Sequence, residues 1–422
     1  MTSFLFCVFF LFLIMGVPIA ISLGVASICT LLVGTHMPLL ILPQKIYNGV
    51  NSFPYMAIPL FLLAGNIMAE AKISERLVAL AQLFVGRFPG GLAHVSTGAC
   101  AFFGAISGSA PATTAAIGTI MIPSMEKRGY NKAFSAAVVA ASGALGLIIP
   151  PSLTMVVFGV MSGASIGTLF LCGIIPGILI SLVIMLVNYV IAKKKGLVSE
   201  KPIPLSEAGH ILRESILALL MPFIILGGIY SGIVTPTEAA CVSVFYALFV
   251  SLVVYRSITL KDLIPFLASS VKTYGGLAFV LAFATAFGRV LSLTRATKVI
   301  EDFIVGNFTT SWSVLSVLVI LFLILGMVMD TGPAIVILAP ILLPAVQALG
   351  VDSVHFGVIL VCCLSIGLAT PPFGLDLFVA GNLAEEPPMA VAKRAVPFII
   401  AFLLALALIT YVEPVSLALL GR

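Results

Sequence analysis

The chain has 422 residues, of which 61% are hydrophobic and 9% are charged. Soluble domains contain about 45–50% apolar and about 25% charged residues, so this composition excludes an ordinary soluble protein. Nucleic-acid binding is also disfavoured, because the 21 Lys and Arg residues behind the net charge of +5 are spread along the whole chain and form no basic face. Most of the surface must face lipid or lie inside a helix bundle.

Apolar runs mark the predicted membrane crossings, because a helix of about 20 residues spans a hydrocarbon layer of about 30 Å. The first run, over 4–34, is too long for a signal-peptide core, so we expect it to be a retained transmembrane helix. The predicted crossings number nine and cover 4–34, 53–71, 131–162, 165–192, 213–233, 236–255, 272–291, 353–382 and 395–418.

Two further apolar segments are interrupted in the middle. The segment 91–126 is broken at 107–111, and the segment 309–349 is broken at 330–333. An arm of about 14 residues reaches only about 21 Å, so these segments are predicted to be re-entrant helical hairpins, with two short crossings each as the alternative. Amphipathic stretches that precede the hairpins, and are expected to lie along the interface as supporting arms, cover 73–86 and 295–306.

Proline pairs interrupt two of the predicted crossings at mid-length. Pro150 and Pro151 lie within 131–162, and Pro371 and Pro372 lie within 353–382. A proline removes a backbone donor and clashes with the carbonyl four residues earlier, so both helices must break there. Unwound backbone at this depth is tolerated only where it is buried in protein or lines a cavity.

The two halves of the chain are self-similar at an offset of 221 residues. Five matched pairs share this offset: Pro123 with Pro344, Gly129 with Gly350, Gly146 with Gly367, Pro150 with Pro371, and Pro151 with Pro372. Five crossings separate the repeats, so the second repeat is expected to be inverted in the membrane. Inverted repeats with discontinuous helices are typical of secondary transporters. We therefore predict an all-α polytopic membrane protein with inverted structural repeats, two re-entrant hairpins and two Pro-broken helices.

Orientation follows from the basic residues, because loops rich in Lys and Arg stay in the cytoplasm. The triplet Lys193–Lys195 is the clearest marker. Threading outward from it places 16 basic residues inside and 5 outside. This split predicts a cytoplasmic N-terminus and an outer C-terminus.

No nucleophile–base constellation, HExxH motif or phosphate-binding loop occurs, which argues against an intramembrane enzyme. The cysteines lie in apolar runs without metal-ligand spacing, and we expect small core residues at Cys7, Cys29, Cys100, Cys172, Cys241, Cys362 and Cys363. Solvated histidines are expected at or near loop ends, at His36, His94, His210 and His355.

Hydroxyl groups are concentrated at the first hairpin tip. Ser107, Ser109, Thr113 and Thr114 surround Pro111. Hydroxyls together with freed carbonyls predict a neutral oxygen cage for a desolvated hard cation such as Na⁺. Ordinary packing of small residues between helices is the alternative.

Acidic residues within the membrane are costly and usually functional. Asp330, beside Thr331 at the second tip, is expected to act as a cation ligand, as a helix N-cap, or as both. Asp376 follows the second proline pair. It is expected either to bind a ligand as a site residue or to pair with another residue as part of the structure.

An anionic substrate is favoured by geometry, because the arms after Pro111 and Pro151 should begin with free amides aimed at the midplane. Arg289 is a candidate carboxylate partner, although snorkelling towards the interface is the simpler interpretation.

Several motifs together resemble the large membrane subunit, the DctM-like permease, of tripartite ATP-independent periplasmic (TRAP) transporters. The resemblance runs from end to end and is carried by Ile58–Met68, Ser107–Ala110, Ile149–Ser152, Thr235–Ala239, Gly326–Asp330 and Thr370–Gly374. It implies a Na⁺-driven importer of a carboxylate, such as a C4-dicarboxylate or a sialic acid, in the bacterial inner membrane. It also implies a separate small four-helix membrane subunit, a periplasmic substrate-binding protein, and an elevator mechanism.

The resemblance also implies where the ligands bind. The Na⁺ sites would be formed by Ser107, Gly108, Ser109, Gly146, Pro150, Gly326, Asp330, Thr331, Gly332, Gly367 and Thr370. Candidate substrate-binding residues are Thr113, Thr114, Ser152, Pro371, Gly374 and Arg289. The transport domain would comprise 89–162 and 309–385, and the scaffold and arms would comprise 1–88, 163–308 and 386–422. The alternative function is a stand-alone Na⁺- or H⁺-coupled anion transporter that needs no binding protein.

Overall fold

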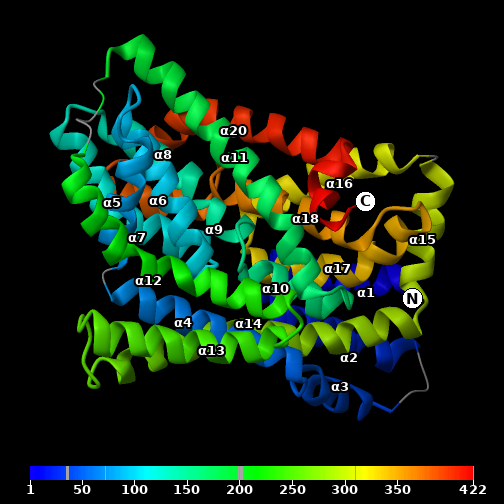
Figure 1. Cartoon of the computed structure of the whole chain (residues 1–422). Coiled ribbons are helices and arrows are strands. Elements are labelled where there is room, and N and C mark those ends of the chain that lie inside the picture. Colours follow the sequence, from blue (N-terminus) through cyan, green and yellow to red (C-terminus); the bar gives the residue numbers. More distant parts are fainter. Residues whose placement is uncertain (35–37, 72, 198, 200–202, 309, 422) are drawn as a thin grey trace.

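The computed structural model describes residues 1–34, 38–71, 73–197, 199, 203–308 and 310–421. Within these residues the secondary structure is helical and contains no strand (Figure 1). The all-α prediction is therefore confirmed.

The first half of the chain runs from the amino terminus to the long helix that ends in the lysine triplet. Its helices are α1 (Thr2–Ile14), α2 (Ile19–Gly34), α3 (Ile41–Val50), η1 (Phe53–Met56), α4 (Ala57–Glu70), α5 (Ile73–Val85), α6 (Gly91–Ser107), α7 (Ala110–Lys127), α8 (Lys132–Gly143), α9 (Leu145–Ile148), α10 (Leu153–Ser162) and α11 (Ile166–Lys195).

The second half begins with a helix that joins the two repeats. Its helices are α12 (Leu205–Tyr230), α13 (Pro236–Phe249), η2 (Val250–Val254), α14 (Leu263–Leu293), α15 (Ala296–Asn307), α16 (Ser311–Val328), α17 (Thr331–Ala348), α18 (Ser353–Leu368), α19 (Leu375–Ala384), α20 (Pro388–Tyr411), α21 (Glu413–Leu417) and η3 (Ala418–Leu420).

The single crossing predicted over 4–34 is wrong, because this segment forms two helices. Gly16 adopts a left-handed conformation with φ +81° and Pro18 follows it, so the chain turns between α1 and α2. The Met1 side chain packs against Gly34, which makes the two helices antiparallel. An apolar run of this length concealed a turn whose signal, a glycine closely followed by a proline, is visible in the sequence.

The extra turn changes the relation between the termini. Both chain ends lie in the right-hand half of Figure 1, and the arm α5 lies at the left-hand edge. This arrangement favours the same side of the membrane for both termini, in place of the predicted opposite sides. If the basic loops keep α5 and the end of α11 in the cytoplasm, both termini face outward.

A cysteine-labelling experiment checks this topology. Single cysteines at Lys127 and Gly350 should react with an impermeant reagent from opposite sides, because the hairpins of the two repeats are inverted. Single cysteines at Thr2 and Gly350 should react from the same side. Labelling of Thr2 together with Lys127 would restore the single amino-terminal crossing.

Both interrupted segments form helical hairpins, as predicted. The arms are longer than the expected 14 residues, with 17 residues in α6 and 18 in each of α7, α16 and α17. Nine helices among the described residues are long and apolar enough to cross a membrane. Seven of them match predicted crossings, and the other two are the hairpin arms α16 and α17.

The inverted repeat accounts for the architecture. Shifting the bounds of α7 by 221 residues gives the bounds of α17, and the arms α5 and α15 lie at opposite edges of the molecule (Figure 1). The hydroxyl of Ser365 donates a hydrogen bond to the carbonyl of Ala144, which is its equivalent 221 residues earlier. Equivalent positions contact one another only near a two-fold axis, so the pseudo-symmetry axis passes between the two broken helices.

Helix contacts follow the same symmetry. Helix α7 packs on α19 and α17 packs on α10, so each hairpin contacts the broken helix of the other repeat. Apart from the hairpins and broken helices, α4 packs on α13 and α2 packs on α14. The two hairpin tips are thereby held at the breaks, which places the predicted site residues around a common centre.

Candidate functional site

The first hairpin tip lies against the first helix break. Gly108 has φ +62° and joins α6 to α7, and its carbonyl accepts a hydrogen bond of 3.3 Å from the amide of Leu153. A Cβ atom on Gly108 would lie 3.0 Å from the carbonyl oxygen of Pro151. Because Pro151 is at mid-length in the apolar segment Lys132–Ser162, the tip sits near the bilayer centre, as a re-entrant hairpin requires.

Oxygen atoms from the tip converge on the opposite helix. The hydroxyls of Ser107 and Thr113 are 2.9 Å apart, and Thr113 donates a 2.7 Å hydrogen bond to the carbonyl of Ser109. Gly146 lies directly against this group, since a Cβ atom there would be 2.7 Å from the Ser109 carbonyl oxygen. The structure therefore brings together four of the residues predicted for the first cation site and its surroundings.

At the first helix break, two side-chain hydroxyls donate hydrogen bonds to a backbone carbonyl of the same segment. Ser152 and Thr154 both donate to the carbonyl of Leu147, and their hydroxyl oxygens are 2.8 Å apart. Sequence reasoning missed Thr154, although its position in the first helical turn after the proline pair could have indicated it.

Free amides were expected at the start of the helices after Pro111 and after Pro151. This expectation is wrong in part for the helix after Pro151. The amide of Leu153 bonds to Gly108, and the amide of Met155 donates to the Ser152 hydroxyl. Serine side chains cap helices in this way, and the cap removes amides that an anion would need. By contrast, α7 has no side-chain cap from Ser109.

The second hairpin contacts the second broken helix where two glycines meet. A Cβ atom on Gly367 would lie 2.5 Å from the backbone carbon of Gly326, and one on Gly326 would lie 2.9 Å from backbone atoms of Leu364. Thr370 donates a 2.7 Å hydrogen bond to the carbonyl of Ile366, and Gly374 closes the turn against the backbone of Thr370. Main chains thus meet closely at the second site, where no larger residue fits.

Asp330 lies exposed at the second tip and caps α17. One of its carboxylate oxygens accepts a 2.7 Å hydrogen bond from the amide of Thr331, which is itself buried. The capping role is therefore confirmed, and the cation-binding role stays a prediction. Gly332 packs against Leu277 of α14.

Asp376 is fully buried, with 0% exposure, and neither of its carboxylate oxygens has a hydrogen-bond partner among the described residues. The hydroxyl of Thr114 is also buried and lies close to this carboxyl group, and Asp330 is near enough to interact with it electrostatically. Acidic residues buried this deeply within a membrane protein are costly and usually functional. Asp376 therefore stays a candidate site residue, with Thr114 as its nearby hydroxyl.

The two half-helices behind this carboxylate run side by side. Thr114 faces Asp376 at their first turns, and Gly118 packs on Leu383 one to two turns later, so α7 and α19 are parallel. Both N-termini consequently lie together at the centre, and neither has a side-chain cap. Adjacent positive helix ends favour an anionic group.

The two breaks differ in exposure. Pro150, Pro151 and Ser152 are buried, whereas Pro372 and Phe373 are exposed. Pro371 is intermediate. The second site is thus more open than the first.

Arg289 lies in a different cleft from the hairpin tips. It is exposed and lines a hollow with Lys45 and Thr285, between α3 and α14. Leu277, which contacts the second tip, is 12 residues earlier on α14, or about 18 Å along the helix. The structure therefore does not bring Arg289 to the other predicted substrate residues.

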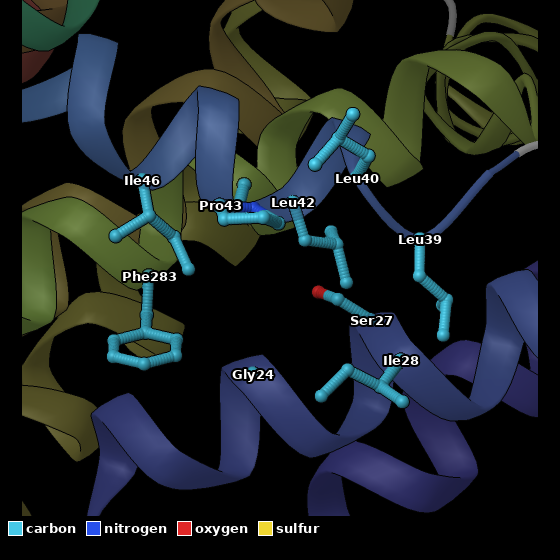
Figure 2. A pocket seen from close by; sticks show the side chains of 10 residues that line it. Gly24, Ser27, Ile28, Leu39, Leu40, Leu42, Pro43, Ile46 and Phe283 are labelled. Carbon is cyan, nitrogen blue, oxygen red and sulfur yellow. The ribbon is translucent and has the colours of Figure 1, made fainter.

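An apolar cavity of about 390 Å³ lies between α2, α3 and α14 (Figure 2). Phe283, Leu42 and Ile46 line it, and Gly24 forms part of its floor. The described residues that line this cavity include no charged side chain, so it does not resemble a site for an anion.

Histidines and cysteines partly depart from expectation. His94 and His355 are buried rather than solvated, and the ring of His355 lies 2.6 Å from the Ser416 hydroxyl. His210 is exposed as expected, and His36 lies outside the described residues. Cys7 is exposed at the apolar surface instead of in the core. Among the described residues, no three or more His, Cys, Asp and Glu side chains form a cluster that could bind a metal.

Comparison with known proteins places the chain in a family. The family model of the tripartite ATP-independent periplasmic transporter, DctM component, matches residues 6–415. The chain is 43% identical over 99% of its length to the isethionate TRAP transporter permease protein DctMQ of Oleidesulfovibrio alaskensis, of which it spans 66%. It is 40% identical to the C4-dicarboxylate TRAP transporter large permease protein DctM of Pseudomonas aeruginosa, covering 94% of this chain and 93% of the relative.

A third relative is the sialic acid TRAP transporter large permease protein SiaM of Vibrio cholerae, which is 34% identical over 96% of this chain and 95% of the relative. The crystal structure of the Alcanivorax borkumensis YdaH transporter superposes with a TM-score of 0.67 at 15% identity, covering 91% and 89% of the two chains, and supports the fold. On the family model and these identities, the chain belongs to the DctM family of TRAP transporter large permeases and is a multi-pass inner-membrane transport protein, not an enzyme.

Proposed function

We propose that this permease imports a small organic anion together with Na⁺, and that it receives the anion from a periplasmic binding protein. The observation that carries the proposal is the meeting of each hairpin tip with a helix break. At the first tip, Ser107, Ser109 and Thr113 present oxygens to Gly146, and at the second tip Gly326 meets Gly367. Neutral oxygens from unwound backbone at mid-membrane suit a desolvated monovalent cation.

The anion would bind between the cation sites. The uncapped N-termini of α7 and α19 supply the positive ends of two helix dipoles, and Thr114 lies in the first of these turns. Thr113, Thr114, Ser152, Pro371 and Gly374 remain the candidate substrate residues. Relatives are named for isethionate, C4-dicarboxylates and sialic acid, so both carboxylates and sulfonates belong in the substrate screen.

Elevator movement is part of the proposal. The hairpins and broken helices pack on one another across the repeats, and α2, α4, α13 and α14 pack together as a frame, of which α4 and α14 also contact the hairpins. The greater exposure of the second break is what an inverted-repeat transporter with one side open would show. A small four-helix membrane subunit is the proposed partner of the frame.

Reconstituted uptake tests the function. With its small subunit and binding protein in vesicles, the permease should accumulate a labelled organic anion only when an inward Na⁺ gradient is imposed. Replacing external Na⁺ by K⁺ should abolish accumulation, because the larger ion fits a compact oxygen cage poorly. Omitting the binding protein should have the same effect.

A stand-alone carrier predicts a different result. Uptake that persists without the binding protein would favour a Na⁺- or H⁺-coupled anion transporter, and uptake that is unchanged in K⁺ would remove Na⁺ from the mechanism. A pH gradient imposed in K⁺ buffer separates H⁺ coupling from facilitated diffusion.

A further inference from the structure

A basic cleft lies at the predicted cytoplasmic boundary, where the arm α5 meets α12 and the end of η2. It has a volume of about 800 Å³ and is lined by Arg76 of α5, by His210, Arg213 and Glu214 of α12, and by Tyr255. The Arg76 guanidinium stacks on the Tyr255 ring, 3.4 Å from its centroid. The cleft therefore holds two arginines at the joint between the arm and the helix that connects the repeats.

These two arginines have no ion-pair partner within the part of the chain that the structure describes. Glu214 is the carboxylate that lines the cleft, and it faces His210, with Nδ1 3.6 Å from Oε1. The backbone around the arginines is fixed, because Ser215 donates a 3.0 Å hydrogen bond to the carbonyl of Arg76. Arg76 is held in place, Arg213 lines the same cleft, and neither forms an ion pair with Glu214. Two such guanidinium groups are suited to a phosphate, which arginine can bind through paired hydrogen bonds.

An apolar groove continues from the cleft towards the membrane interior. It has a volume of about 300 Å³ and lies between α5 and α12, with Leu80, Leu219, Leu220 and Phe223 among its lining residues. Ile216 lines both the groove and the basic cleft, so the two hollows adjoin. From Arg213 to Phe223 the helix advances about 15 Å, which equals half of a hydrocarbon layer of about 30 Å.

We propose that this composite site binds one anionic phospholipid. The phosphate of a glycerophospholipid such as phosphatidylglycerol contacts Arg76 and Arg213, and one acyl chain lies along the groove beside Ile216 and Phe223. Charge complementarity and the continuity of the groove with the cleft select a lipid over a soluble phosphate compound, which would leave the groove empty. Basic pockets between helices on the cytoplasmic side bind anionic headgroups in this way.

The bound lipid would brace the arm against the scaffold. Helix α5 leads directly into α6 of the first hairpin, and α12 packs on α13 of the frame. A lipid that contacts both helices holds the arm at the interface while the hairpin moves. We therefore expect anionic lipid to support uptake in addition to binding.

Lipid binding can be measured by native mass spectrometry on the full-length permease in detergent with added phosphatidylglycerol. The chain-matched phosphatidylcholine should bind at least tenfold more weakly. The double variant Arg76→Gln/Arg213→Gln should lose about thirtyfold in phosphatidylglycerol affinity, because each basic residue near an anionic headgroup contributes about fivefold. The matched control Lys193→Gln/Lys194→Gln removes the same charge outside the cleft and should retain the affinity.

Two further measurements separate a lipid from a free phosphate. The variant Ile216→Trp fills the groove and should weaken lipid binding, while the two arginines remain in place. In a competition measurement, glycerol 1-phosphate at millimolar concentration should not displace the lipid. The single variant Arg213→Gln changes an exposed side chain and keeps the fold. Equal binding of the two lipids, unaltered affinity in both Arg variants, or displacement by glycerol 1-phosphate would overturn the proposal.

Discussion

Replacing Gly367 by alanine should reduce uptake by more than tenfold, although alanine is the better helix former. The added methyl would lie 2.5 Å from the backbone carbon of Gly326, and a main chain cannot move aside as a flexible side chain can. Overpacking of this kind costs about 1–3 kcal/mol, which exceeds the gain of about 1 kcal/mol from replacing glycine within a helix. The second hairpin would be displaced from the break, and the predicted Na⁺ site between them would be lost.

A matched glycine tests whether the contact or the helix is responsible. Gly276 lies in α14, and a Cβ atom added there would have no neighbour within 4 Å. Gly276→Ala should therefore leave uptake and melting temperature unchanged or slightly raised. Both variants are compared by reconstituted uptake and thermal melting, and normal uptake by Gly367→Ala would show that the two main chains separate in the working protein.

The sequence predicted the inverted repeat because its signals are local and survive in both halves. Proline pairs break helices wherever they occur, and the matched positions Gly146 and Gly367 lie at the two tight contacts between hairpin and broken helix. Membrane crossings were equally predictable, since the bilayer fixes the length of an apolar run. The all-α fold and the two hairpins followed from these features.

Hydropathy alone could not resolve the amino-terminal segment. The run from 4 to 34 carries no charge, so a tilted helix and a tight hairpin give the same hydropathy signal. The turn depends on the left-handed conformation of Gly16, which a weak local preference permits but does not require. The predicted side of the N-terminus rested on that single crossing, because one additional crossing would reverse the side on which a chain begins.

The sequence could not predict which side chains surround each site residue, because these neighbours come from segments that are far apart in the chain. The sequence marked Asp376 as an intramembrane acid, but the hydroxyl beside it, Thr114 of the first repeat, is set by how α7 packs on α19. Arg289 was a candidate carboxylate partner on its charge, with snorkelling as the simpler interpretation, and the structure places it in a different cleft from the tips. The position of Arg289 along α14, and not its charge, decides which residues its side chain can contact.

Replacing Asp330 by asparagine should separate its two roles. Asparagine caps helices nearly as well as aspartate, and its carbonyl oxygen can accept the Thr331 amide that Asp330 accepts at 2.7 Å. A neutral oxygen forgoes the attraction of a full charge for Na⁺, so we expect apparent Na⁺ affinity to fall by about tenfold, equivalent to about 1.4 kcal/mol. Expression and melting temperature should change little.

The alanine variant and a second capping aspartate complete the comparison. Asp330→Ala removes the cap as well as the charge and should also lower the melting temperature, by the roughly 1 kcal/mol that a lost N-cap costs. Asp352 caps α18 by accepting the amides of Val354 and His355, so Asp352→Asn changes a cap of the same kind away from the tips and should keep the wild-type Na⁺ dependence. The measurement is the Na⁺ concentration for half-maximal uptake alongside thermal melting. If Asp330→Asn keeps the wild-type Na⁺ dependence while Asp330→Ala only melts earlier, Asp330 is a cap alone, and the second cation site must be formed by the backbone carbonyls around Gly326 and Gly367.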